Sequence, residues 1–146
     1  MTISECAFCS RPENRERIIL DSGYAWSFLT NIPITPGHTL ICPTRCVATF
    51  AELYDYERAD IFGQLSVVQK ALKHTFYAEG FNIAWNEGEV AGQSVPHFHI
   101  HVVPRKEGDA GIMEYEPRKF LYRPGSREQS PEDELQATAR LIRAQL

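Results

Sequence analysis

The chain of 146 residues lacks a long apolar run, and it also lacks an excess of basic residues. No stretch of roughly 18 or more hydrophobic residues occurs, so no membrane partner is expected. Lysine and arginine number 15 against 19 aspartate and glutamate residues, a net charge of -4. Proteins that bind nucleic-acid backbones present a basic face. No nucleic-acid partner is therefore expected, although a local pocket for one nucleotide is compatible with this composition.

Features of an export signal are also missing. The opening residues, MTISECAFCS, contain neither a basic segment nor an apolar core, so we expect a cytoplasmic protein. The four cysteines are then expected as free thiols or metal ligands rather than as disulfides. No internal repeat, low-complexity tract or linker divides the chain, whose length suits one domain with its own core.

The apolar pattern predicts several short strands. Their expected positions are residues 18–29 (two strands around a turn at 21–23), 39–43, 81–86 and 97–103. A long helix is expected from about Asp55, as N-cap, to Ala78, with Gly80 as its stop. Its apolar stripe is Ile61, Leu65, Val68, Leu72 and Phe76.

A second helix is expected at the C-terminus, with Ser130 as its cap and Pro131 in its first turn. Its inner face would be Leu135, Ala139, Ile142 and Leu146. Residues 116–130 are expected to form an irregular connection. Together the elements predict an α+β fold, with a mostly antiparallel sheet, a long helix packed on it and a C-terminal helix.

Three of the five histidines occupy alternate positions in HFHIHVV, residues 97–103. Successive side chains of a strand point to opposite faces, so His97, His99 and His101 should share one face, opposite the core. Ordinary outward positions carry lysine, glutamate, threonine or serine, so three histidines in register indicate chemistry. Neutral imidazole is a nucleophile and proton carrier near neutral pH, and it is also a common zinc ligand. Both readings stay open at this point.

This run resembles the signature of the histidine triad (HIT) superfamily, His-φ-His-φ-His-φ-φ with φ apolar, at all seven positions. The resemblance extends over roughly residues 6–105 and includes CAFC, PGHTLICP and NEGEVAGQSVPHFHIHVVPR. It implies a HIT-like fold, with residues 1–110 as the domain core and residues 111–146 as a C-terminal extension of the same domain. It also implies a homodimer.

The resemblance implies a nucleotide hydrolase in which His99 attacks the α-phosphorus and forms a covalent nucleotidyl-histidine intermediate. His101 would contact the phosphate and help to protonate the leaving group. His97 would support the geometry by hydrogen bonding, and His38 would buttress the site. Expected substrates are purine nucleotide conjugates with an AMP or GMP moiety, either phosphoramidates or dinucleoside polyphosphates. The chemistry would need no metal, because backbone amides would hold the developing charge.

Other positions match substrate-binding residues of the family. For the phosphate region these are Asn86, Gly92, Gln93 and Ser94. The nucleoside positions are Phe8, Phe28 and Leu40 for the base, with Thr30 and Asn31 beside the ribose. The family often has aspartate or asparagine where Thr30 stands, so the ribose contacts of this chain depart from the pattern.

A structural zinc site is also implied. In some HIT proteins a Cys-x-x-Cys pair binds zinc together with the first triad histidine and a histidine eight residues after the Gly-His pair. That last position is Cys46 here, which gives the set Cys6, Cys9, Cys46 and His97. Four protein ligands leave no open position, so the zinc would be structural. Cys42 lies outside the set.

Three alternatives remain beside hydrolysis. One is a nucleotidyltransferase or phosphorylase, although such family members often carry glutamine where this chain has His101. The second is a non-catalytic nucleotide-binding protein on the same fold. The third is a metal protein in which the three histidines of the triad chelate zinc themselves.

Overall fold

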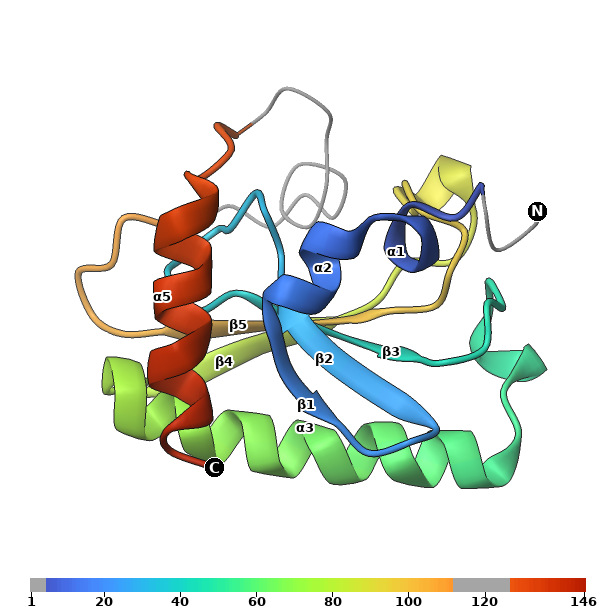
Figure 1. Cartoon of the computed structure of the whole chain (residues 1–146), viewed down its shortest axis with the longest axis horizontal. Coiled ribbons are helices and arrows are strands. Elements are labelled where there is room, and N and C mark those ends of the chain that lie inside the picture. Colours follow the sequence, from blue (N-terminus) through green and yellow to red (C-terminus); the bar gives the residue numbers. More distant parts are fainter. Residues whose placement is uncertain (1–4, 112–126) are drawn as a thin grey trace.

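The computed structural model describes residues 5–111 and 127–146, in which a five-stranded sheet carries helices on both faces (Figure 1). The strands are β1 (Ile18–Asp21), β2 (Ala25–Leu29), β3 (Thr39–Pro43), β4 (Gly80–Ala84) and β5 (Ile100–Arg105). Their order in the sheet is β1-β2-β3-β5-β4, and all neighbouring pairs are antiparallel. Of the expected irregular connection, residues 116–126 lie outside the described residues.

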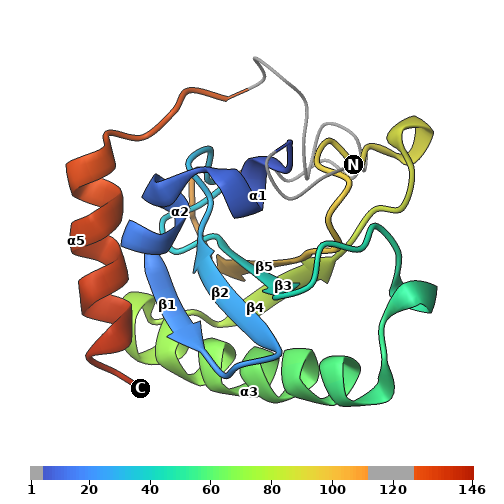
Figure 2. The same cartoon turned by 45° about the vertical axis from the view of Figure 1, so that its right-hand side comes forward.

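The helices are divided between the two faces of the sheet. The long helix α3 (Asp55–Phe76) crosses one face, and the short helices α1 (Ala7–Ser10) and α2 (Pro12–Glu16) cover the other (Figures 1 and 2). The C-terminal helix α5 (Glu132–Arg143) packs against β1 and against α3. Two 3₁₀ turns, η1 (Phe50–Glu52) and η2 (Glu89–Ala91), complete the elements. No helix in the described residues is long and apolar enough to span a membrane.

Both faces of the sheet are apolar, so every residue of β2 and β3 is buried. Alternate residues point to opposite faces. Leu29 and Ile41 therefore join the main core with α3 and α5, whereas Phe28 and Leu40 join a second cluster with Phe8 of α1. This second cluster lies on the face where the histidines are found. The predicted α+β architecture, the strand pair in 18–29 and the strand at 39–43 are confirmed.

The expected ends of the long helix were wrong by one to three residues. Its N-cap is Tyr54 rather than Asp55, and the Glu57 carboxylate accepts a hydrogen bond from the Tyr54 N–H at 2.8 Å. Its C-cap is Tyr77, in the left-handed conformation (φ 56°), whereas Gly80 opens β4. The apolar stripe is confirmed, because all five of its residues belong to or pack against the main core.

The two strands around the histidines are displaced from their expected bounds. The strand expected at 81–86 spans Gly80–Ala84, and the one expected at 97–103 spans Ile100–Arg105. Pairing with β3 begins at Ile100, and pairing with β4 begins at His101, opposite Ala84 at the end of β4. Residues 97–99 leave the ladder although β3 continues to Pro43: the N–H of Phe98 donates to the carbonyl of Val47 at 2.6 Å, and Nε2 of His97 donates to the carbonyl of Pro43 at 2.8 Å.

Two details of the C-terminal helix also differ. Pro131 is the N-cap, not Ser130, and no side chain caps this end. The backbone N–H of Ser130 instead donates to the carbonyl of Asn31, which ties this segment to the loop after β2. Leu135, Ala139 and Ile142 are buried as expected, but Leu146 follows the end of the helix and is 50% exposed.

Candidate functional site

The three alternating histidines lie together on the sheet face that α1 and α2 cover. His97, His99 and His101 are 0%, 8% and 5% exposed, respectively. The ring centroids of His99 and His101 are 4.9 Å apart, and the ring of Phe8 meets His99 edge-on at 4.9 Å. Phe98, Ile100 and Val102 join the main core on the opposite face. Alternation therefore holds across the segment, although only His101 of the three lies in a strand.

One hydrogen bond determines which nitrogen of His99 is bare. Its Nδ1 lies 2.7 Å from the carbonyl oxygen of His97. A carbonyl only accepts, so Nδ1 carries the proton and the neutral ring keeps a lone pair on Nε2. This is the arrangement that a nucleophilic imidazole needs.

A second chain of hydrogen bonds determines the proton positions of His38 and His101. The N–H of Ile34 donates to Nδ1 of His38 at 3.0 Å, so neutral His38 carries its proton on Nε2. That Nε2 donates to Nδ1 of His101 at 2.9 Å. Neutral His101 must then carry its own proton on Nε2. His38 therefore lies where it can buttress His101, and it leaves His101 with an N–H to offer.

Burial keeps these rings neutral. It lowers the pKa of His38 to about 3 and that of His99 to about 4, and it holds the pKa of His101 well below its ordinary value. The charge of Arg127 lowers the pKa of both His38 and His101 further. Near neutral pH the site thus presents one bare nitrogen, on His99, next to one N–H, on His101.

The segment before the triad is a tight turn. The Gln93 carboxamide donates to the carbonyl of Ala48 and accepts from the N–H of Gly88, both at 2.8 Å. The backbone N–H groups of Gly92 and Gln93 donate to Glu89 and Gly88 inside the turn. To bind a phosphate they would have to exchange these partners. Ser94 is exposed immediately before the histidines.

Asn86 follows β4 and is half-buried. The register pairs Ala84 with His101. Asn86 lies two residues beyond that last pair, where β4 has ended.

The expected base pocket is an aromatic wall beside the triad. Phe8, Phe28 and Leu40 belong to one buried cluster, and Phe8 meets Phe28 edge-on at 5.3 Å. Trp26 stacks on Phe28 with ring centroids 4.4 Å apart, and the Arg15 guanidinium lies 4.0 Å above the Trp26 ring. Sequence reasoning missed Trp26, although its alternation with Phe28 in β2 was a usable signal.

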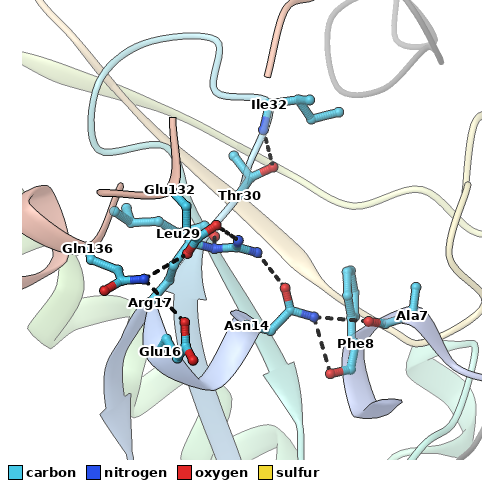
Figure 3. A network of polar contacts seen from close by, with 10 residues as sticks. All are labelled: Ala7, Phe8, Asn14, Glu16, Arg17, Leu29, Thr30, Ile32, Glu132 and Gln136. Carbon is cyan, nitrogen blue, oxygen red and sulfur yellow. Dashed lines mark hydrogen bonds and ion pairs between the residues drawn. The ribbon is translucent and has the colours of Figure 1, made fainter. Parts of the chain in front are cut away.

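At the ribose position, Thr30 is buried and its hydroxyl accepts a hydrogen bond from the N–H of Ile32 (Figure 3). Asn31 beside it is half-buried, and its carbonyl receives the bond from Ser130. Arg127 donates from Nε to the carbonyl of Ile32 at 2.7 Å. The C-terminal segment therefore lies along this loop, and no sequence motif pointed to Arg127.

Four candidate metal ligands converge beside the triad. The ligand atoms of Cys6, Cys9, Cys46 and His97 all lie within 4.8 Å of one another. Nδ1 of His97 is 3.3 Å from Sγ of Cys6 and 3.5 Å from Sγ of Cys9. Donors around one tetrahedral zinc ion lie about 3.3–3.8 Å apart. The donor set and its spacing thus fit zinc.

The protein also orients the imidazole for such a metal. Nε2 of His97 donates to the carbonyl of Pro43 at 2.8 Å, which leaves the lone pair of the neutral ring on Nδ1, facing the thiols. Without metal, burial raises the pKa of Cys9 to about 12 and also raises that of Cys46. Cys42 is buried outside this group. The ring of His97 therefore faces the cysteines, while its backbone carbonyl accepts the hydrogen bond from His99.

Comparison with known families and curated proteins gives consistent matches. The model of the HIT domain matches residues 11–108. The asymmetrical bis(5'-nucleosyl)-tetraphosphatase of Schizosaccharomyces pombe is 40% identical over 83 residues, covering 57% of this chain and 46% of that protein. The bis(5'-adenosyl)-triphosphatase of Saccharomyces cerevisiae is 36% identical over 103 residues, covering 69% and 50%. The chain spans about half the length of these two relatives.

Solved structures with the same fold include a Zn-bound histidine triad family protein from Mycobacterium smegmatis. It is 26% identical with a TM-score of 0.74, covering 99% of this chain and 94% of that one. A Hit-like protein from Bartonella henselae has a TM-score of 0.78 at 22% identity, covering 98% and 97%. These likenesses confirm the fold expected from the sequence.

Proposed function

Because the chain belongs to the HIT domain family, we propose that it is a nucleotide hydrolase that cleaves dinucleoside polyphosphates at the α-phosphorus. The observation that carries the proposal is the bond from Nδ1 of His99 to the carbonyl of His97, which leaves Nε2 of His99 bare. Both curated relatives described above are named as hydrolases of this substrate class. Phosphoramidates with an AMP or GMP moiety are further candidate substrates.

In the first step, the Nε2 lone pair of His99 attacks the α-phosphorus and forms a P–N bond. The P–O bond to the leaving group breaks, and its electron pair stays on the leaving oxygen. The Nε2–H of His101 donates a hydrogen bond to that oxygen and stabilises its charge as it departs, while His101 keeps its proton. In the second step, water attacks phosphorus, the P–N bond breaks with its electron pair returning to Nε2 of His99, and the proton of the water passes to solvent as a nucleoside monophosphate leaves.

Several side chains would hold the substrate during these steps. The apolar wall of Phe8, Phe28 and Leu40 would hold a purine base, and Thr30 with Asn31 would contact the ribose. Asn86 and Ser94 would bind phosphate oxygens, and the turn at Gly92 and Gln93 would bring backbone close to them. No step uses a metal ion.

The test is turnover of diadenosine tri- and tetraphosphate and of adenosine phosphoramidate by the wild type and by His99→Ala. Loss of the nucleophile should lower kcat by a factor of at least about 10³, with AMP binding retained. A rapid quench of the wild type should trap adenylate on the protein, and the variant should trap none. Equal turnover by the two proteins would overturn the mechanism.

We further propose that Cys6, Cys9, Cys46 and His97 hold a structural zinc ion, which joins the N-terminal segment to the triad. The support is the convergence of the four ligand atoms and the orientation of His97. Cys46→Ser should lose about one bound zinc per chain, whereas Cys42→Ser should retain it. Elemental analysis measures both. A zinc ion lost only on His99→Ala would instead favour chelation by the triad.

A homodimer is the remaining proposal. In the described part of the chain β4 is an edge strand, with β5 as its one neighbour, and Ile83 on it is 41% exposed. An open edge can pair with a second copy. Sedimentation equilibrium should give a dimer for the wild type and a monomer for Ile83→Lys, while Val90→Lys on η2 stays dimeric. A wild-type monomer would refute it.

A further inference from the structure

Asn14, in α2, is a buried side chain to which sequence reasoning assigned no role. It is 5% exposed, and both ends of its carboxamide are engaged (Figure 3). Nδ2 donates to the carbonyls of Ala7, at 2.9 Å, and Phe8, at 3.3 Å. Oδ1 accepts from a guanidinium nitrogen of Arg17. Because a guanidinium only donates, the orientation of the amide is determined, with its N–H groups toward α1.

Arg17 anchors this amide to the rest of the fold. Its side chain is 5% exposed, donates from Nε to the carbonyl of Leu29 at 3.1 Å, and pairs with Glu132 at 2.8 Å. A buried guanidinium is tolerated only when its donors are satisfied. Arg17 is therefore held by β2 on one side and by the first turn of α5 on the other, as Figure 3 shows. Arg17 therefore fixes the position of the Asn14 carboxamide.

The two carbonyls that Asn14 binds lie between the metal-site cysteines Cys6 and Cys9. We call residues 6–9 the metal loop. A helix as short as α1, four residues long, cannot satisfy its own terminal carbonyls. Asn14 supplies the missing donors, so the backbone of the metal loop is fastened to α2 in the absence of any metal.

The same loop carries an aromatic wall of the site. Besides its edge contacts with Phe28 and His99, Phe8 lies 5.6 Å from the ring of His97. Its carbonyl is held by Asn14, so the direction of its side chain depends on that bond. A shift of the metal loop would move Cys6, Phe8 and Cys9 together, while leaving the bond between His99 and the His97 carbonyl in place.

From this geometry we infer that Asn14 is a positioning residue, which sets the nucleoside-binding wall through Phe8 and preorganises the Cys6–Cys9 half of the metal site. The inference deepens the proposed function and rests on it for the identity of the substrate. It assigns to Asn14 an effect on nucleotide affinity and on metal retention, and none on the chemical step.

The decisive variant is Asn14→Asp, which keeps the shape of the side chain and the acceptor for Arg17 but removes both donors to the metal loop. Zinc-loaded protein is mixed with a coloured chelator to follow metal release, and AMP affinity is measured by calorimetry. Release should be about tenfold faster and AMP binding about tenfold weaker, with KM raised and kcat within about twofold. The control is Gln136→Ala, which removes an exposed end of the same network and should leave both measurements unchanged.

A double-mutant cycle with Phe8→Ala tests whether Asn14 acts through Phe8. If it does, Asn14→Asp should weaken AMP binding much less in the Phe8→Ala background than in the wild type. Additive effects would overturn the inference, as would wild-type zinc release and AMP affinity in Asn14→Asp, or a fall in kcat at unchanged affinity. Should circular dichroism show that Asn14→Asp is unfolded, Asn14→Ser removes the same donors without a charge and the same outcomes apply.

The two proposals fail separately. If the wild type binds AMP but turns over no conjugate, the hydrolase proposal is refuted, and zinc release with AMP affinity still decides the role of Asn14. If the wild type is active and Asn14→Asp behaves as the wild type, the function stands and the inference falls.

Discussion

The neighbouring imidazoles of His99 and His101 present a lone pair and an N–H, respectively, because their Nδ1 atoms have different partners. Nδ1–H of His99 donates a hydrogen bond to the His97 carbonyl, whereas the lone pair on Nδ1 of His101 accepts one from Nε2–H of His38. Burial keeps both rings neutral. A bare nitrogen and an N–H therefore lie side by side, as nucleophilic displacement with a hydrogen bond to the leaving group requires.

The burial of His38 predicts how the free energy of unfolding depends on pH. Its ring is fully buried, and its pKa falls from 6.5 to about 3 on folding. The unfolded chain thus binds the proton more readily, so this contribution to stability is complete above about pH 6.5 and is lost as the pH falls. As the pH falls from 6.5 to 5, the free energy of unfolding should fall by about 1.6 kcal/mol for this histidine, with a slope that approaches about 1.4 kcal/mol per pH unit.

The measurement is urea unfolding of the wild type and His38→Asn across that range, with zinc saturating in both so that metal-linked protons cancel. His38→Asn should show the flatter profile. Parallel profiles for the wild type and His38→Asn would contradict the assignment.

Sequence reasoning reached the residues of the site better than their contacts. Alternation placed the three histidines on one face, and the family pattern brought Cys46 to Cys6 and Cys9. It could not reveal Asn14 and Arg17, because the run RPENRERI reads as a solvated, charged segment. Arg17 is bound by Glu132 of α5 and Asn14 binds the metal loop, and the Arg17–Glu132 pair joins residues 115 positions apart. No local pattern encodes such a contact.

Among the elements, the loop between β2 and β3 depends on one glycine. Gly37 has φ +90°, and a Cβ there would lie 2.5 Å from the ring of Phe76 on α3. Gly37→Ala should therefore cost about 2 kcal/mol of unfolding free energy, from backbone strain and from the clash. Gly63 is exposed within α3, and a Cβ added there would meet no atom within 4 Å. Gly63→Ala should stabilise the protein by about 0.5–1 kcal/mol.

Thermal and urea unfolding of both variants tests the pair, and equal effects would refute the argument.

The elements themselves were predictable from their periods, whereas their ends were not. β5 begins at Ile100 because the preceding backbone leaves the ladder, with the N–H of Phe98 bound to the carbonyl of Val47. The end of α3 at Tyr77 similarly depends on a left-handed residue that carries no glycine signal.

At the scale of the whole molecule, the two faces of the sheet have separate tasks. The α3 face holds the main core, and the α1–α2 face holds the histidines, the buried cluster with Phe8 and Phe28, and residues 6–9. Fold class and the long helix followed from the sequence, because hydrophobic patterning determines which faces are buried. The place of the C-terminal segment did not follow, because its hydrogen bonds to the loop after β2, from the N–H of Ser130 and from Nε of Arg127, both end on backbone carbonyls, which carry no sequence signal.

The match to the HIT domain family ends at residue 108, before α5 begins. We nevertheless expect α5 to unfold in one cooperative unit with the sheet and α3. Ile142 of α5 is fully buried in the main core with residues of α3 and the sheet. Ile142→Ala should cost about 3 kcal/mol, whereas Leu141→Ala, at a 60% exposed position, should cost about 0.5 kcal/mol or less. Trp26 lies on the opposite face of the sheet, so in a Trp85→Phe background, which removes the second tryptophan, its fluorescence reports the site rather than the helix. If α5 and the sheet unfold as one unit, the fluorescence and far-ultraviolet circular dichroism transitions of Ile142→Ala shift together. A fluorescence transition left at the wild-type midpoint would instead show that α5 unfolds as a separate unit.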